Sequence, residues 1–278
     1  MVNYKIFDDY IQVFNGDEFN IQHILECGQV FRYKNTPFGY TIYSADQKAD
    51  IYCQKDSVKI FCKNKKFFIK YFDLDTNYDT IKSAISGEQY VDDAIKFGYG
   101  IRILKSDPFE MIISFIISAN NNIPRIKATI DKIVMAYGSK IDDYYAFPTA
   151  KQLALADEQF FKSVGCGYRS AYLVDTVAKL VDYDFGKIET MSTDEAKKEL
   201  LKFKGIGPKV ADCILLFGFN KADVFPTDTW IVHTYESMYG KSNKSVKEIN
   251  KFFTDKFGKY SGYAQQYLFY SQRENNIK

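Results

Sequence analysis

Apolar and polar residues alternate in parts of the first hundred positions, whereas apolar residues recur at helical spacing in the rest of the chain. The segments 49–53 and 57–62 place every second apolar side chain on one face, which is the period of half-buried antiparallel strands. Asp56 and Ser57 supply a turn between the two segments. We therefore predict a small antiparallel sheet with one or two helices over residues 1–105.

The helical pattern begins at Asp107. Asp107 and Pro108 suit the N-cap and first-turn positions of a helix whose run from Phe109 to Ile117 is apolar nearly all round, so this helix should lie in the core. A second helix should begin near Pro124 and end at Gly138. Further helices are predicted around residues 150–163, 170–182, 193–203, 208–218, 229–239, 245–257 and 261–273.

The change of pattern near residue 105 predicts two domains. An N-terminal antiparallel sheet domain, residues 1–105, would pack on a mainly α-helical domain, residues 106–278, which makes the fold class α+β. A chain of 278 residues with 46% hydrophobic and 26% charged residues has the composition of a folded globular protein. Its net charge of +2 is too small to indicate a nucleic-acid-binding surface and does not exclude one.

Cysteine and histidine usage restricts the possible chemistry. The five cysteines form no C-x-x-C pair and there are only two histidines, so a zinc or iron–sulfur site has little to build on. The N-terminus lacks the basic and apolar regions of a signal peptide, and no stretch approaches the roughly 20 apolar residues of a membrane span. An odd number of cysteines fits a reducing compartment. These features lead us to expect a cytoplasmic protein without a membrane partner.

The most informative segment runs from residue 192 to residue 219. Ser192 and Glu195 form a capping box that starts one helix, and Pro208 suits the first position of the next. Gly205 and Gly207 lie between them and predict a very short hairpin that joins the two helices over residues 193–218. Backbone N–H groups in such a turn can approach a phosphate, although spacing alone favours an ordinary helix–helix corner.

Lys209 and Asp228 are candidate catalytic residues, each at the beginning of a predicted helix. The positive end of its helix should lower the pKa of Lys209, and an amine with a lowered pKa can form a Schiff base at a sugar C1′. An ionised Asp228 could stabilise the positive charge that develops on a sugar as its base departs. Taken singly, Lys209 is also explained as a solvated lysine on a helix, and Asp228 as a simple helix cap.

The glycine hairpin, the lysine directly after it and the Pro-x-Asp before the next helix together resemble the helix-hairpin-helix superfamily of base-excision repair glycosylases. The run 205–213 is similar, more narrowly, to the 8-oxoguanine DNA glycosylase branch. The resemblance covers nearly the whole chain and implies a sheet domain packed on a helix-hairpin-helix core. It implies a bifunctional DNA repair enzyme, an N-glycosylase and abasic-site lyase, in which Lys209 attacks C1′ and Asp228 assists base departure. Gly205 and Gly207 then become contacts to the DNA backbone.

The resemblance also implies a pocket for a flipped purine. Gln265 and Phe269 lie four residues apart on the last predicted helix, so they face the same way. They match a glutamine that reads the Watson–Crick edge and a phenylalanine that stacks on the base, while Cys213 matches the residue on the opposite face. Gly28 matches the glycine whose carbonyl accepts the N7–H that only the oxidised purine carries.

Further residues match the DNA contacts of the family. Asn120 would fill the gap left by the flipped base, and Tyr168 would be a wedge. Arg125 and Arg169 would contact the orphaned cytosine, although Pro124 alters the backbone next to Arg125. The implied partner is double-stranded DNA that contains 8-oxoguanine, bound by a monomer. No cofactor and no catalytic metal are implied, and a structural monovalent cation at the hairpin is the one ion we expect.

The sequence departs from the family pattern at one position, and two other functions remain as alternatives. Trp230 stands where the family often has a phosphate-binding histidine, and His233 lies one helical turn further on. A glycosylase for alkylated purines is one alternative, but such enzymes typically lack the hairpin lysine. A non-catalytic DNA-binding module is the other. It would explain the two hairpin glycines but leave four residues unexplained: Gly28, Lys209, Asp228 and Gln265.

Overall fold

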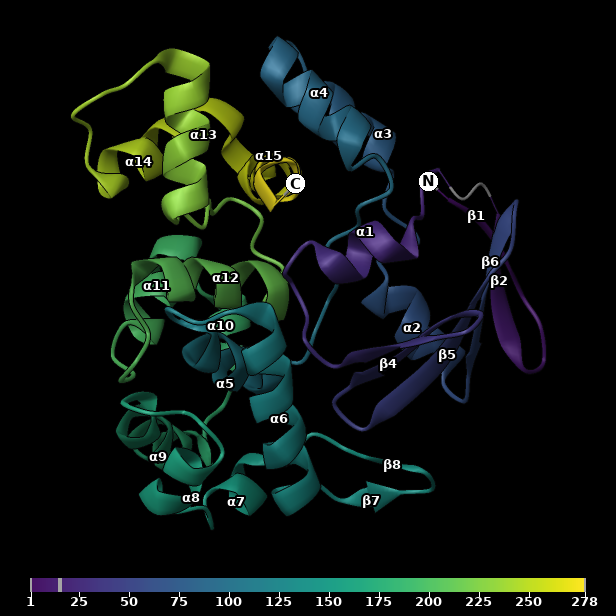
Figure 1. Cartoon of the computed structure of the whole chain (residues 1–278), viewed down its shortest axis with the longest axis vertical. Helices are drawn as coiled ribbons and strands as arrows, with labels where there is room; N and C mark the ends of the chain where they lie inside the picture. The colour runs from purple at the N-terminus through teal and green to yellow at the C-terminus, as the bar shows by residue number, and fades with distance from the viewer. Residues whose placement is uncertain (1, 15–16, 278) are drawn as a thin grey trace.

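The structure is a computed structural model that describes residues 2–14 and 17–277 (Figure 1). Its N-terminal part contains a six-stranded antiparallel sheet with the strand order β1-β2-β6-β5-β4-β3. Ile11 of β2 pairs with Ile60 of β6, and Ile60 pairs with Ile51 of β5, so one buried row crosses the sheet. The strands are β1 Asn3–Ile6, β2 Tyr10–Phe14, β3 Tyr33–Thr36, β4 Gly39–Ser44, β5 Gln47–Cys53 and β6 Ser57–Cys62. The predicted antiparallel sheet is confirmed.

Four helices, rather than one or two, accompany the sheet within the first 105 residues: α1 Ile21–Glu26, α2 Lys65–Tyr71, α3 Tyr78–Ile85 and α4 Gln89–Phe97. The expected number was wrong because these helices have six to nine residues and give only a short periodic signal. Their start signals are nevertheless in the sequence, since asparagines 20, 64 and 77 each accept a hydrogen bond from a first-turn N–H.

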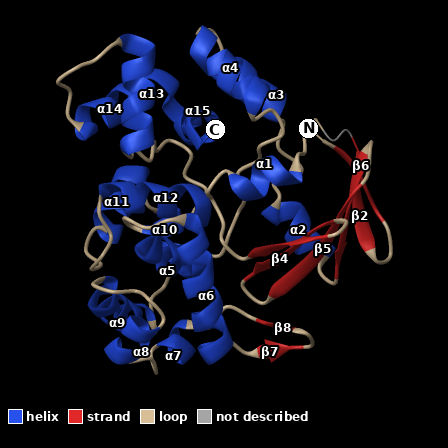
Figure 2. Ribbon diagram, in the orientation of Figure 1, coloured by secondary structure: helices blue, strands red, loops and turns tan. Residues whose placement is uncertain are grey.

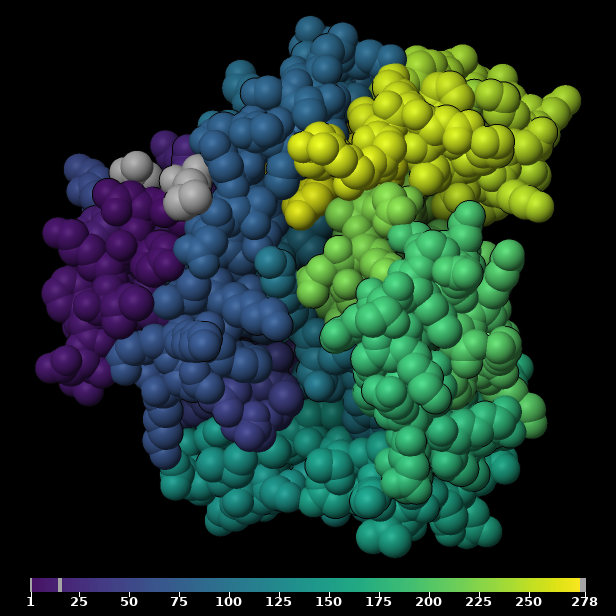
Figure 3. Space-filling view, turned by 180° about the vertical axis from the view of Figure 1, so that it is seen from behind, coloured from purple at the N-terminus to yellow at the C-terminus, as the bar shows by residue number. Residues whose placement is uncertain are grey.

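Helices α3 and α4 pack away from the sheet. Val91 and Ala94 of α4 share an apolar cluster with Tyr267 and Leu268 of the last helix, α15 (Ser261–Ile277). In the view from behind, residues of this blue region lie beside the yellow C-terminal helices (Figure 3). Residues that precede position 105 therefore contribute to the packing of the C-terminal helices, and a domain boundary near that position stays a prediction.

The remaining chain is mainly helical, with its helices grouped beside the sheet (Figure 2). Nine of the eleven residues of α5 are buried, and α5 packs against α12 at the centre of the largest apolar cluster, as its all-round apolar character predicts. The other helices are α6 Ile123–Tyr137, α7 Ala150–Leu153, α8 Glu158–Ser163, α9 Arg169–Leu180, α10 Gly186–Thr190, α11 Thr193–Leu200, α12 Pro208–Gly218, α13 Thr229–Tyr239 and α14 Val246–Phe257, while α5 is Pro108–Ser118.

Three details of this region differ from the predicted elements. The segment 150–163 forms two helices because Asp157 caps a new one, its carboxylate accepting from the N–H of Phe160 at 2.7 Å. Helix α10 and a short hairpin, β7 Lys140–Ile141 with β8 Tyr144–Tyr145, were not predicted.

Within the described ranges, no helix is both long enough and apolar enough to cross a membrane.

Candidate active site

A cavity of about 1000 Å³ lies between the N-terminal part and the helices. Its walls come from the segment after α1, the loop between α5 and α6, the start of α12, the loop before α13, and α15. Five of the residues predicted from the sequence line this cavity: Gly28, Asn120, Lys209, Asp228 and Phe269. They come from positions almost 250 residues apart, so the fold brings them to one site.

The glycine hairpin lies between α11 and α12, and its two glycines have different surroundings. Gly205 has φ +84°, and a Cβ there would lie 3.0 Å from Cβ of Tyr172 and 3.2 Å from Ile116. Gly207 has an ordinary φ of −90° and open space around it. No side chain caps the N-terminus of α12. Its first-turn N–H groups can therefore bind an anion such as a DNA phosphate.

Substituting each hairpin glycine by alanine should separate folding from DNA binding. Gly205→Ala is expected to destabilise the protein by about 1–2 kcal/mol, because alanine is strained at positive φ and its methyl group meets Tyr172. Gly207→Ala should cost about 0.5 kcal/mol or less, yet weaken binding to duplex DNA of any sequence. Denaturant titration and fluorescence anisotropy measure the two effects. Equal loss of stability in both variants would contradict this assignment.

Lys209 lies in the first turn of α12, half-buried at the cavity, with Nζ 5.7 Å from the ring centroid of Phe115. The predicted lowering of its pKa is wrong. Burial does lower the pKa of Lys209, but the neighbouring Cys213 and the carboxylate of Asp228 stabilise the ammonium, and the net pKa is raised. Lys209 is therefore an ammonium in the free protein and must lose a proton before its nitrogen can attack a sugar.

Cys213 lies one turn after Lys209 on α12 and is buried. Burial raises the pKa of its thiol to about 11, against the lowering effect of Lys209. The thiol is accordingly neutral near pH 7, so Cys213 is a polarisable apolar group rather than a second nucleophile.

Asp228 is the N-cap of α13, as predicted. Its carboxylate accepts a hydrogen bond from the N–H of Ile231 at 3.1 Å. The carboxylate thus lies at the positive end of a helix and on the wall of the cavity that holds Lys209. From this position the carboxylate can face the positive charge that develops on a sugar as its base departs.

Asn250 of α14 holds the loop that carries Asp228, a role that was not predicted from the sequence. Its side-chain N–H groups donate to the carbonyl of Phe225 at 2.6 Å and to the hydroxyl of Thr227 at 3.2 Å. They also donate to the buried carboxylate of Asp212 on α12 at 3.2 Å, and Asp212 pairs with Lys197 of α11 at 2.6 Å. This network joins the helix of Lys209 to the loop of Asp228. Its partners are 23 to 38 residues from Asn250, which no local motif reveals.

The residues predicted to bind the base fall into two groups. Gly28 and Phe269 meet at the cavity wall, where a Cβ on Gly28 would lie only 3.2 Å from Cε1 of Phe269. Gln265 is 3% exposed and accepts a hydrogen bond from Gln266 at 3.1 Å. Gln265 and Cys213 lie behind the cavity surface rather than on it.

Asn120 lines the cavity, whereas the other residues predicted to contact DNA do not. Asn120 is exposed at φ +49°. Its carbonyl accepts from the buried guanidinium of Arg169 at 2.8 Å, and this guanidinium also donates to the carbonyls of Ala119 and Cys166 at 2.8 and 3.2 Å. Arg169 therefore fixes the loop of Asn120. Tyr168 is 58% exposed, and Arg125 is exposed with a long 3.4 Å contact to the carbonyl of residue 165.

Trp230 lines the same cavity, and His233 is exposed one turn further along α13. Nδ1 of His233 lies 3.8 Å from the carboxylate of Glu236. The indole of Trp230 can donate one hydrogen bond but carries no charge, so it is a weaker phosphate ligand than a protonated histidine. Across the described part of the chain, no three or more histidine, cysteine or acidic residues lie close enough together to hold a metal ion.

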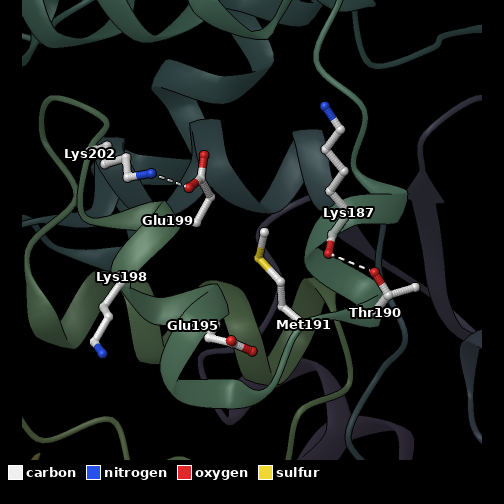
Figure 4. Close-up of a pocket in the computed structure, with 7 residues that line it drawn as sticks. All are labelled: Lys187, Thr190, Met191, Glu195, Lys198, Glu199 and Lys202. Carbon is white, nitrogen blue, oxygen red and sulfur yellow. Dashed lines mark hydrogen bonds and ion pairs between the residues drawn. The ribbon is translucent and has the colours of Figure 1, made fainter.

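A second hollow, of about 520 Å³, lies over α10 and α11 (Figure 4). Its charged groups are paired or point to solvent, as in the contact of Lys202 with Glu199 at 2.5 Å. It contains none of the residues predicted for catalysis or DNA binding. The lining residues are Lys187, Thr190, Met191, Glu195, Lys198, Glu199 and Lys202.

A six-stranded sheet beside a helical core, with a glycine hairpin, a lysine and a capping aspartate at one cavity, is the architecture of a helix-hairpin-helix base-excision repair protein. Two family models match the chain. Residues 12–112 match the 8-oxoguanine DNA glycosylase N-terminal domain, and residues 113–259 match the HhH-GPD superfamily of base excision DNA repair proteins.

Individual relatives agree with the family models. One similar solved structure is the 8-oxoguanine glycosylase/lyase of Clostridium acetobutylicum in complex with double-stranded DNA containing cytosine opposite 8-oxoguanine. Its sequence is 40% identical to this chain, and the two structures superpose with a TM-score of 0.93. The match covers 100% of this chain and 99% of that one. The N-glycosylase/DNA lyase of Saccharomyces cerevisiae is 27% identical over 92% of this chain and 84% of its own. The probable N-glycosylase/DNA lyase of Methanothermobacter thermautotrophicus is 32% identical over 64% of this chain, and the match spans 65% of that protein. The chain belongs to the 8-oxoguanine DNA glycosylase family of the HhH-GPD superfamily.

Proposed function

We propose that this protein excises 8-oxoguanine from duplex DNA and then cleaves the strand at the abasic site. The observation that carries the proposal is the meeting of Lys209, Asp228, Gly28 and Phe269 at one cavity. A purine in a duplex is stacked, so its glycosidic bond becomes accessible to such a cavity only after the base flips out. The protein would work inside the cell on its DNA, as a monomer.

Base removal follows from the two groups at the helix N-termini. Lys209, once deprotonated, attacks C1′ with its Nζ lone pair, and the C1′–N9 bond breaks with its electrons passing to the departing base. Asp228 stabilises the positive charge on the sugar while that bond breaks. The departing base takes up a proton, and the lysine nitrogen, now bonded to C1′, loses one. The nitrogen lone pair then breaks the C1′–O4′ bond, O4′ takes up a proton, and the opened sugar stays attached to Lys209 as a protonated Schiff base. The imine then acidifies the C2′–H, whose loss expels the 3′-phosphate and cuts the strand by β-elimination.

Recognition of the lesion depends on the other side of the cavity. The carbonyl of Gly28 accepts the N7–H of 8-oxoguanine, whereas the N7 of guanine is an acceptor and would face another acceptor. Phe269 and Cys213 stack on the two faces of the base, and Gln265 reads its Watson–Crick edge. Because Gln265 and Cys213 lie behind the cavity surface of the free protein, these two contacts need a small opening of the wall when the base enters.

DNA binding involves the hairpin and the loops that carry Asn120 and Tyr168. N–H groups beside Gly205 and Gly207 bind the DNA backbone, and Asn120 with Tyr168 occupies the space that the flipped base leaves. Arg125 and Arg169 contact the opposite cytosine, and for Arg169 this requires release of its loop carbonyls. The hairpin residues 203–207 carry no carboxylate, so a structural monovalent cation there would be held by backbone carbonyls.

The test is excision from duplexes that carry 8-oxoguanine opposite each of the four bases. We expect strand cleavage with all duplexes that are recognised, fastest with cytosine opposite the lesion, and none with undamaged guanine. Purified protein that releases 3-methyladenine but leaves 8-oxoguanine intact would overturn the proposal in favour of an alkylated-purine glycosylase.

A further inference from the structure

Arg273 of α15 is a buried cation on the wall of the cavity, one turn after Phe269. It is 7% exposed. Its Nε and Nη2 donate to the carboxylate of Glu274 at 3.0 and 2.8 Å, and Nη2 also donates to the backbone carbonyl of Glu26 at the end of α1. Its Nη1 has no hydrogen-bond partner within the described residues. In Figure 1, α1 lies beside the labelled C-terminal end of α15.

The unpaired nitrogen lies beside Gly28. A Cβ on Gly28 would be 3.3 Å from Nη1 of Arg273 and 3.2 Å from Cε1 of Phe269, so all three groups converge at one point. The guanidinium carbon is 5.4 Å from the ring centroid of Phe269. Buried donors are nearly always paired, and an orphaned donor beside a ligand cavity indicates an acceptor that the ligand supplies.

The chemistry of the lesion identifies that acceptor. 8-oxoguanine differs from guanine at two adjacent atoms, since N7 gains a hydrogen and C8 gains the carbonyl oxygen O8. The carbonyl of Gly28 complements the first change, and a donor next to Gly28 complements the second. We infer that Arg273 is a further specificity-determining residue, whose Nη1 donates a hydrogen bond to O8 of the flipped base. This inference builds on the proposed function.

Two contacts of opposite polarity then read the same edge of the base. Normal guanine has a C8–H in place of O8, so it would leave the Arg273 donor unpaired as well as placing its N7 against the Gly28 carbonyl. The Glu274 carboxylate and the Glu26 carbonyl hold the other two nitrogens, which fixes the direction of Nη1. The carboxylate also balances the positive charge of the guanidinium.

The experiment compares 8-oxoguanine with 8-thioguanine, which keeps the N7–H but offers sulfur, a much weaker acceptor, at position 8. Single-turnover excision by the wild-type protein should be about tenfold faster or more for the oxygen compound. Arg273→Met should lower 8-oxoguanine excision by about 10- to 100-fold and make the two rates nearly equal. A purely structural role for Arg273 predicts the same oxygen-to-sulfur ratio in variant and wild type, and that result would overturn the inference.

A matched control uses Arg102, another buried arginine. Arg102 donates to the carbonyls of Phe72 and Thr76 at 3.1 and 2.9 Å and is not part of the cavity. Arg102→Met removes the same chemical group, and its oxygen-to-sulfur ratio should stay at the wild-type value. A fall in that ratio equal to the fall in Arg273→Met would count against a specific contact.

A crystal structure of Lys209→Gln bound to an 8-oxoguanine duplex gives a second readout that needs no change at Arg273. We expect Nη1 within hydrogen-bond distance of O8, and an Nη1 turned away from the base would refute the contact. If the wild-type protein excises neither compound, the proposed function fails. If it excises 8-oxoguanine and the rate ratio is insensitive to Arg273, the inference alone fails.

Discussion

Lys209→Gln should lose borohydride trapping altogether and excise 8-oxoguanine about a thousandfold more slowly or worse, because the amide of glutamine cannot form a Schiff base. Glutamine has a similar shape and keeps the start of α12 helical, so binding to the lesion duplex should be largely retained. Single-turnover excision, trapping on a denaturing gel and fluorescence anisotropy measure the three effects on one protein preparation.

Lys204 provides the control for this substitution. It precedes the hairpin glycines, is exposed, and pairs with Asp175 at 3.1 Å. Lys204→Gln removes a nearby ammonium of the same charge and should still be trapped on DNA. If trapping survives in Lys209→Gln and disappears in Lys204→Gln, the nucleophile is Lys204 and the proposed mechanism is wrong.

Asp228→Asn is expected to slow base removal by about 100- to 1000-fold while leaving the fold intact. Asparagine is as good an N-cap as aspartate, so the hydrogen bond to the N–H of Ile231 can persist and only the charge is lost. Burst kinetics of base release, followed separately from strand cleavage, measure the effect on the first chemical step.

Asp228→Ala tests the structural part of the same residue. It removes both charge and cap, so it should destabilise the protein by about 1 kcal/mol beyond Asp228→Asn, with a similar loss of activity. If Asp228→Asn excises the base at the wild-type rate and only Asp228→Ala is impaired, Asp228 acts as a helix cap and not in the chemistry.

Much of the helical part could be predicted from the sequence. Helices α12 and α13 begin and end where the pattern placed them, because Pro208 and Asp228 are strong local start signals that need no tertiary context. The capping box of Ser192 and Glu195 is likewise confirmed. The segment 150–163 was harder, since the cap at Asp157 interrupts a run whose apolar spacing continues across it.

The electrostatics of the site could not be predicted in the same way. The pKa of Lys209 was expected to be lowered by the end of α12 alone, but Cys213 on the same helix and Asp228 on another element reverse the shift. Asn250 and Arg273 matter through contacts to residues far away in sequence, as when Arg273 meets Glu26 across 247 positions. Local propensity carries no information about such pairs.

Some of the predicted site residues make other contacts in the free protein and must rearrange to reach DNA. In the free protein Arg169 binds loop carbonyls, and Gln265 lies behind the cavity surface, so neither presents its predicted contact. Gly28, Asn120 and Phe269 already line the cavity. The family resemblance supplied these assignments, and the structure shows which of the residues line the cavity in the free protein.

The most direct test of the central claim is a peptide map of wild-type protein reduced with borohydride on an 8-oxoguanine duplex. We expect a single covalent adduct, with the reduced sugar attached to Nζ of Lys209 in the peptide that contains this lysine. An adduct on another amine, or base release without any adduct, would contradict it.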